Sequence, residues 1–196
     1  SARARRTFHL GAGDYAELVL LPRLAARLAA AIAQGDLDAV IAPARRRDVA
    51  GPGTYQRLLF EETFVCAVRA GHPAIRSRLT LDRYCALDHL LIAPRGTSGG
   101  LVDDALAALG KQRRVALAVP HFLIVPHVVA STDLIVTIAS RIAAAFRESH
   151  RLATLRPPAE LGLSGFPMHL IWHERSHADD AQRWLRDQIV AVAGRA

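Results

Sequence analysis

The sequence predicts an α/β protein, because short apolar segments typical of strands alternate with segments of helical periodicity along the chain. Of the 196 residues, 51% are hydrophobic and 22% are charged, which is the composition of a globular chain and not of a disordered one. This length is enough for one large domain or for two small lobes, each with its own core. Because helices separate successive strands, we expect mostly parallel sheets.

The first part of the chain contains two short predicted strands, Thr7–Leu10 and Leu37–Ala42, with a helix between them. Asp14 is placed to cap that helix, in which leucines recur at helical spacing. A long extended segment, Tyr55–Val68, follows a glycine-rich loop. Its length is sufficient to leave one lobe and enter another.

The rest of the chain alternates more regularly between the two periodicities. The predicted strands are Leu90–Ala93, Val115–Val119, Leu134–Ile138, Leu152–Leu155 and Pro167–Trp172. The predicted helices are a short one from Thr80, then Leu101–Leu109, Leu123–Ala130, Ser140–Ser149, and a last helix capped by Ser176 that runs through Ala193.

The formal net charge of +7 comes almost wholly from arginine, since Lys111 is the only lysine. The arginines, for example Arg57, Arg141 and Arg186, are scattered and have no aromatic residues interleaved between them. This pattern favours a solvated surface over a nucleic-acid interface.

Two cysteines, Cys66 and Cys85, are too few for a disulfide framework, and neither has a CxxC partner. Cys66 lies in an apolar run, so we expect it to be buried.

The longest apolar stretch, Leu123–Ile138, is interrupted by Pro126 and Asp133, so no membrane span is predicted. No apolar signal-peptide region follows the basic N-terminus, and a reducing cytoplasm is the expected location.

Two motifs suggest chemistry that their context does not support. Gly11–Ala16 matches the dinucleotide fingerprint G-x-G-x-x-A, but no second strand ends in an acidic residue about 20 residues later. We interpret it as a turn whose amides can receive an anion.

His173–His177 matches the zinc-protease motif H-E-x-x-H, but His173 ends a predicted strand and Ser176 is placed to cap the next helix. We therefore expect no metal site, with the two histidines on different elements.

The segment Arg95–Gly100 joins a predicted strand to a predicted helix and is rich in hydroxyl groups and glycine. It lacks the Gly-Lys-Ser/Thr ending of a P-loop and the G-x-S-x-G pattern of a nucleophile elbow. A ligand-binding turn and a plain capped turn both remain open for this segment.

Seven stretches carry a family resemblance by their order and spacing: Gly13–Leu24, Gly35–Ile41, Leu59–Val68, His72–Pro73, Leu79–Leu81, Ser131–Ile138 and Trp172–Leu185. Together they resemble the effector-binding domain of LysR-type transcriptional regulators, which has the type II periplasmic-binding-protein fold. The resemblance implies two Rossmann-like lobes joined by two crossover strands. Lobe I would comprise residues 1–62 plus 163–196, and lobe II residues 63–162.

The resemblance also implies a ligand-sensing domain and not an enzyme. A small carboxylated or aromatic effector would bind in the cleft between the lobes, with no cofactor and no metal. The residues expected to contact it are Gly13, Asp14, Tyr15, Pro43, Arg95, Gly96, Thr97, Ser98, His121 and Phe122.

The expected partners follow from the same family. The chain begins at Ser1 and lacks the family's N-terminal helix-turn-helix, so we expect a piece of a longer protein that contacts DNA only through that missing part. A homodimer or homotetramer through the lobes is expected, and no membrane partner. One departure concerns Leu28–Ile32, which crosses the place of a family strand. Either about 20 residues are deleted there or the chain is broken.

Two other classes remain as alternatives. A periplasmic solute-binding protein shares the same fold, and a Rossmann-type oxidoreductase would use the glycine-rich turn to bind NAD.

Overall fold

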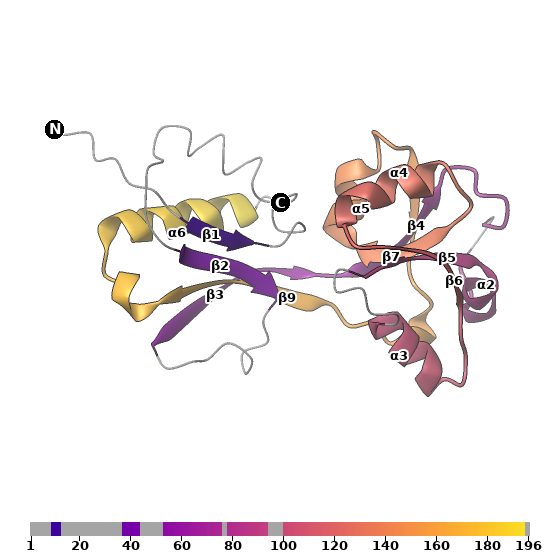
Figure 1. The fold of residues 1–196 in the computed structure, drawn as a ribbon, viewed down its shortest axis with the longest axis horizontal. Helices are drawn as coiled ribbons and strands as arrows, with labels where there is room; N and C mark the ends of the chain where they lie inside the picture. Colours follow the sequence, from indigo (N-terminus) through magenta and orange to yellow (C-terminus); the bar gives the residue numbers. More distant parts are fainter. Residues whose placement is uncertain (1–8, 13–36, 44–52, 76–77, 94–99, 195–196) are drawn as a thin grey trace. The chain divides into compact units, whose positions relative to one another are not determined.

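The structure is a computed structural model, and it describes residues 9–12, 37–43, 53–75, 78–93 and 100–194. The chain divides into two compact units (Figure 1). Unit 1 comprises residues 1–62 and 166–196, and unit 2 comprises residues 63–165. The chain therefore passes between the units twice, at Glu62–Thr63 and at Gly165–Phe166. The α/β class is confirmed, since each unit combines one sheet with helices.

Unit 1 contains a four-stranded sheet in the order β1-β2-β9-β3. The strands are β1 (His9–Ala12), β2 (Leu37–Pro43), β3 (Thr54–Glu62) and β9 (Phe166–His173). β1 and β2 are parallel, whereas β9 is antiparallel to both β2 and β3. After β9 come the short 3-10 helix η3 (Glu174–Ser176) and the helix α6 (Asp180–Ala193).

Unit 2 contains a five-stranded sheet in the order β6-β5-β7-β4-β8. Its strands are β4 (Phe64–Arg69), β5 (Asp88–Ile92), β6 (Arg114–Val119), β7 (Ile135–Ala139) and β8 (Leu152–Leu155). Its helices are α2 (Leu81–Ala86), α3 (Leu101–Ala108), η1 (Phe122–Ile124), α4 (Val125–Ala130), α5 (Ser140–Phe146) and η2 (Ala159–Leu161). Every strand and helix that the sequence predicts between residues 80 and 155 is present.

The core of unit 2 forms because its central strands bury side chains on both faces. In β4 the consecutive residues Cys66, Ala67 and Val68 are all buried, as expected for a strand with neighbours on both sides and helices against its faces. Tyr84 of α2 and Leu106 of α3 complete this core at 0% and 1% exposure. The prediction that Cys66 is buried is confirmed.

The prediction of mostly parallel sheets is wrong, because four of the seven described strand pairings are antiparallel. Each antiparallel pairing involves a strand next to one of the two passages between the units. These strands are β3 and β4 at the first passage and β9 at the second. A chain that leaves a unit and later returns runs in opposite directions on the two occasions. β3 and β9 consequently pair antiparallel along their lengths.

Two predictions about the C-terminal region need correction. The last helix is capped not by Ser176 but by Asp179, whose carboxylate accepts a hydrogen bond from the Gln182 N–H at 2.9 Å. Arg186 is not a surface arginine, since only 6% of it is exposed. Its guanidinium donates to the carbonyl oxygens of Ser176 and His177 at 3.1 and 2.8 Å, and it lies over the ring of Trp172.

The expected irregularity at Leu28–Ile32 lies outside the described residues, so the choice between a deletion and a break stays a prediction. None of the helices in the described part of the chain is long and apolar enough to cross a membrane.

Candidate functional site

The carboxyl ends of parallel strands define the candidate site in unit 2. β5 lies between β6 and β7 and is parallel to both, so all three strands end at the same edge of the sheet. The Ala93 N–H donates to the Val119 carbonyl at 2.8 Å, which places the chain leaving β5 beside the chain leaving β6. Loops at such an edge are where open α/β sheets bind ligands.

His121 and Phe122 lie directly after β6, at this edge. His121 has an extended backbone and precedes η1; its side chain is exposed. Phe122 begins η1 and is half-buried. The other predicted residues of this unit, Arg95, Gly96, Thr97 and Ser98, follow Ala93 in sequence but lie outside the described residues.

In unit 1 the corresponding edge is formed by β1 and β2. Ala12, the last residue of β1, pairs with Ile41, and β2 ends two residues later at the exposed Pro43. The predicted contacts Gly13, Asp14 and Tyr15 come directly after Ala12 and also lie outside the described residues.

A buried ion pair fixes α3, the helix that follows the Arg95–Gly100 segment. Arg113 donates from Nε and Nη2 to the two carboxylate oxygens of Asp103, each at 2.8 Å. The Arg113 side chain is 3% exposed and that of Asp103 28%. The hydrogen bonds from Arg113 lower the pKa of Asp103. Burial alone would lower the pKa of Arg113, but its bonds to Asp103 raise it above the usual value. Both groups are therefore charged at neutral pH.

His89 of β5 extends this polar cluster into the core. It is 0% exposed, and its Nε2 lies 2.8 Å from the Tyr84 carbonyl, so Nε2 carries the proton. Nδ1 is then the acceptor that faces Arg113 Nη1 at 3.4 Å. Burial lowers the pKa of His89 to about 4, and the ring is neutral at pH 7.

The Tyr84 hydroxyl continues the cluster to β7 and β4. It lies 2.7 Å from Thr137 Oγ1, and Cys66 Sγ lies 3.6 Å from the same oxygen. Burial raises the pKa of the Cys66 thiol to about 11 and that of Tyr84 to about 12. Both groups therefore keep their protons at neutral pH. Through these hydrogen bonds the cluster holds α3 in position.

The amino end of α3 has a mixed electrostatic character. Its helix dipole favours an anion, and Arg113 neutralises the charge of Asp103 in the first turn. Asp104, in the same turn, places a second carboxylate near that end and opposes an anion. A carboxylate ligand at this end would therefore need a cation of its own.

The H-E-x-x-H motif lies on two elements, as expected, and not on one helix. His173 ends β9, and its Nδ1 accepts the Arg175 N–H at 3.2 Å. His177 follows η3; its Nδ1 accepts the indole N–H of Trp172 at 3.2 Å, and its ring stacks on Tyr55 with 4.1 Å between centroids. Each Nδ1 is thus occupied by a hydrogen bond. In the described residues, no group of three or more His, Cys, Asp or Glu is arranged to hold a metal ion.

The cluster around Arg113 was not predicted from the sequence. That arginine stands in a short polar run, Lys111–Arg114, which resembles a solvated loop. Its partners Asp103 and His89 are 10 and 24 residues away, at no helical or strand spacing. The only available signal was a histidine inside the apolar strand β5.

The HTH-type transcriptional activator NahR of Pseudomonas putida is 31% identical to this chain over 202 residues, which cover 93% of the chain and 66% of NahR. The HTH-type transcriptional regulator SyrM of Rhizobium meliloti (strain 1021) is 32% identical over 202 residues, with 93% and 60% covered. The chain thus spans less than two thirds of the length of either relative. The regulatory domain of MexT, a transcriptional activator in Pseudomonas aeruginosa, superposes with a TM-score of 0.76 and 25% identity, covering 95% of this chain and 99% of that one.

The family model described as the LysR substrate binding domain matches residues 16–194, so the chain belongs to the LysR substrate-binding-domain family. The predicted resemblance and the α/β, periplasmic-binding-protein-like fold class are confirmed. The chain is accordingly a regulatory, effector-binding domain and not an enzyme. This excludes the oxidoreductase alternative.

Proposed function

We propose that the chain senses a small carboxylated or aromatic effector and thereby controls DNA binding and transcription by a longer, cytoplasmic bacterial regulator. The observation that supports this most is the meeting of the β5 and β6 ends, where the Ala93 N–H donates a hydrogen bond to the Val119 carbonyl. The loops after these two strands contain residues able to bind an organic acid. The family architecture implies that the effector is held in the cleft between the lobes.

The proposed contacts combine a polar loop with an aromatic wall. From lobe II they are Arg95, Gly96, Thr97, Ser98, His121 and Phe122, and from lobe I Gly13, Asp14, Tyr15 and Pro43. Arg95 offers a bidentate contact to a carboxylate, and Thr97 and Ser98 offer hydroxyl donors. Phe122 offers an aromatic face to a ring.

A thermal-shift screen of small aromatic and aliphatic acids tests the proposal, because a ligand that binds only the folded chain raises the melting temperature. A stabilising acid should lose most of its effect on His121→Ala and Phe122→Ala. The control is Arg183→Gln, an exposed α6 arginine paired with Asp180, which should respond like the parent. Equal stabilisation of both site variants and the parent would place the effector elsewhere.

The longer protein is proposed to bind DNA through an N-terminal helix-turn-helix outside this chain. NahR and SyrM are named as HTH-type regulators, and the chain aligns with only 66% and 60% of them. A helix-turn-helix encoded upstream of Ser1 would support this role. A signal peptide there would favour the periplasmic solute-binding alternative.

We also propose that the domain forms a homodimer through β6, or a homotetramer that contains this dimer. This strand is at the edge of the unit 2 sheet, and Arg114–Ala118 are all exposed, including Val115 at 38% and Leu117 at 41%. An open apolar edge strand can pair with a second copy about a two-fold axis. Leu117→Lys should therefore yield monomers in light scattering, whereas Arg183→Gln should not. A parent chain that is monomeric at high concentration would refute this pairing.

A further inference from the structure

Unit 2 contains a pocket of about 690 Å³ beside β8, the edge strand that is farthest from β6 in the sheet order. The described residues that line it come from the segment before α2 and from the segment at the end of β8: Arg78, Leu79, Leu155, Arg156, Pro157 and Ala159. Because β7 and β4 lie between β5 and β8, the strands β5 and β8 are roughly 14 Å apart at about 4.8 Å per strand. The pocket is therefore separate from the proposed effector site, and a dimer that pairs through β6 leaves it open.

The apolar part of the pocket is attached to the core of unit 2. Leu79 is 3% exposed and belongs to that core, and the half-buried Leu155 packs against it. Two successive prolines, Pro157 and Pro158, restrict the backbone that leaves β8. Both segments that form the pocket are thus held in place before any ligand binds, which lowers the entropic cost of binding.

The charged side chains among the described lining residues are both arginines. Arg78 and Arg156 are exposed, and no aspartate or glutamate is among these lining residues. Within the described part of the chain, neither guanidinium has a hydrogen bond or an ion pair. By contrast, Arg69 and Arg114 of the same unit form ion pairs with aspartates.

The carboxylates nearest in sequence do not neutralise these two cations. Asp82, four residues after Arg78, forms an ion pair with Lys111 at 3.0 Å. Glu160, four residues after Arg156, is exposed, is not among the described lining residues and forms no ion pair with Arg156 there. Even with Glu160 counted, two guanidinium charges stand against one carboxylate, so the pocket favours an anion.

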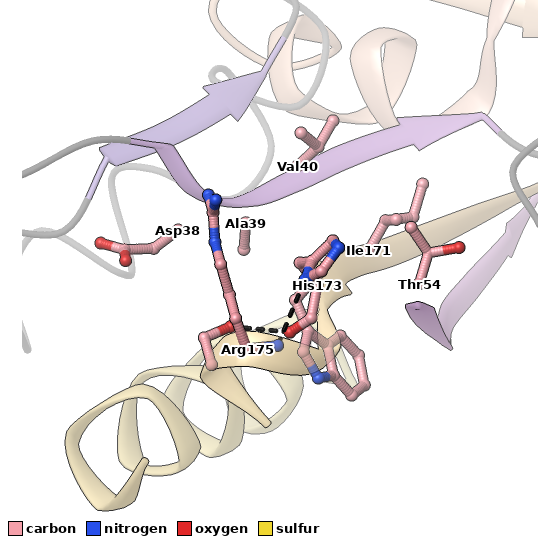
Figure 2. A pocket seen from close by; sticks show the side chains of 9 residues that line it. Asp38, Ala39, Val40, Thr54, Ile171, His173 and Arg175 are labelled. Carbon is pink, nitrogen blue, oxygen red and sulfur yellow. Dashed lines mark hydrogen bonds between the residues drawn. The ribbon is translucent and has the colours of Figure 1, made fainter. Parts of the chain in front are cut away.

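The cavity of unit 1 lacks this excess of positive charge. Its volume is about 200 Å³, and Figure 2 shows Asp38 and Arg175 together among the side chains that line it. Glu174 adds a second carboxylate on the same turn as Arg175. The preference for an anion is therefore a property of the unit 2 pocket.

From these observations we infer that unit 2 has a ligand site, separate from the proposed effector site, that binds an organic dianion. The apolar body of the ligand lies on Leu155 and Pro157, and its two anionic groups bind Arg78 and Arg156. The planar donors of a guanidinium match both oxygens of a carboxylate, and an apolar surface beside such a contact strengthens it. The volume is within the ~300–1,000 Å³ of typical small-molecule sites.

An aromatic dicarboxylate is the suitable probe class, because the two arginines are on the two different segments that form the pocket. Terephthalate has a carboxylate at each end of one ring, whereas benzoate has the same ring and a single carboxylate. In a ¹H–¹⁵N spectrum of the whole chain at about 0.15 M salt, terephthalate should shift the amide signals of Leu155 and Ala159 saturably, since diffuse attraction is screened there. Benzoate should bind at least about tenfold more weakly.

The variants Arg78→Gln and Arg156→Gln each remove one cation from the pocket. Each should weaken the terephthalate-dependent shifts of Leu155 and Ala159 about tenfold, in a chain whose spectrum stays dispersed. The matched control is Arg147→Gln, which removes the same charge from an exposed arginine between α5 and β8, and it should titrate like the parent.

The inference is overturned if Leu155 and Ala159 do not respond to terephthalate, if benzoate binds equally well, or if either pocket variant titrates like the parent. A response confined to the amide signals of His121 and Phe122 reports the effector site and overturns it too. A response of Leu155 and Ala159 that depends on both arginines supports the site, whatever ligand the effector site binds.

Discussion

Replacing Asp103 by alanine should destabilise unit 2 strongly. The substitution leaves the guanidinium of Arg113, which is 3% exposed, without its carboxylate partner. Breaking a buried ion pair from one side costs about 3–5 kcal/mol, because the remaining charge stays in a poorly solvated place. Asp103 itself is 28% exposed, so we expect the lower part of that range, about 3 kcal/mol.

The matched control is Asp82→Ala. Asp82 forms an ion pair with Lys111 at 3.0 Å, but the two side chains are 86% and 46% exposed. An exposed pair of this kind contributes about 0–1 kcal/mol. The double variant Asp103→Ala/Arg113→Leu should regain part of the loss, because it also removes the buried charge.

Urea unfolding distinguishes these outcomes. Both tryptophans are in unit 1, so their fluorescence follows that unit, while far-UV circular dichroism follows both units. With a denaturant slope of about 1–3 kcal/mol per molar, a loss of about 3 kcal/mol lowers the midpoint by roughly 1 M or more. The shift should appear in circular dichroism. A midpoint for Asp103→Ala equal to that of Asp82→Ala would refute the role of this pair.

Three further predictions concern His89, two glycines and the cysteines. Burial lowers the pKa of His89 from its usual 6.5 to about 4. Between pH 6.5 and pH 4 the imidazole is therefore protonated in the unfolded chain but not in the folded one, so the free energy of unfolding falls as the pH falls. The free energy of unfolding should drop by about 2 kcal/mol from pH 7 to pH 5, and His89→Phe should flatten this dependence in urea titrations at both pH values. Gly53→Ala should lower the melting temperature more than Gly71→Ala: both have positive φ (74° and 70°), but only at Gly53 does a Cβ meet neighbours, at 3.1 Å. A thiol reagent should modify Cys85 first and Cys66 only on unfolding, because burial raises the pKa of Cys66 to about 11 and it is 0% exposed; equal rates would contradict this.

Periodicity was sufficient to predict most elements of unit 2, because its strands and helices are short and separated by clear turns. β5, α3 and β6 appear where the apolar segments place them. Strand direction was not predictable in the same way, since it depends on which strands meet. β9 pairs with β3 over 100 residues away in sequence, and no local pattern encodes that pairing.

The arginines show why charge patterns mislead. Arg186 was expected on the surface, yet it satisfies the carbonyl oxygens of Ser176 and His177 at the end of η3. Arg113 was part of a polar run, yet its guanidinium is in the core beside Asp103 and His89. A long side chain can bury its stem and reach distant partners, so its sequence neighbours do not reveal its environment.

The candidate site was predictable in outline, because turns after parallel strands follow from the strand–helix alternation. The structure adds that the loops after β5 and β6 start side by side, through the Ala93–Val119 bond. The effector contacts themselves stay predictions, since they depend on loop conformations outside the described residues.

Titration calorimetry with an effector found in the screen tests the central claim most directly, on Arg95→Ala, Thr97→Ala and Ser98→Ala. Loss of a hydrogen bond to a charged ligand costs about 1.5–3 kcal/mol, so each variant should bind roughly tenfold to a hundredfold more weakly than the parent. Arg183→Gln should bind like the parent. If Arg95→Ala, Thr97→Ala and Ser98→Ala all bind with parental affinity, the effector does not occupy the loop after β5 and the assignment of this site is wrong.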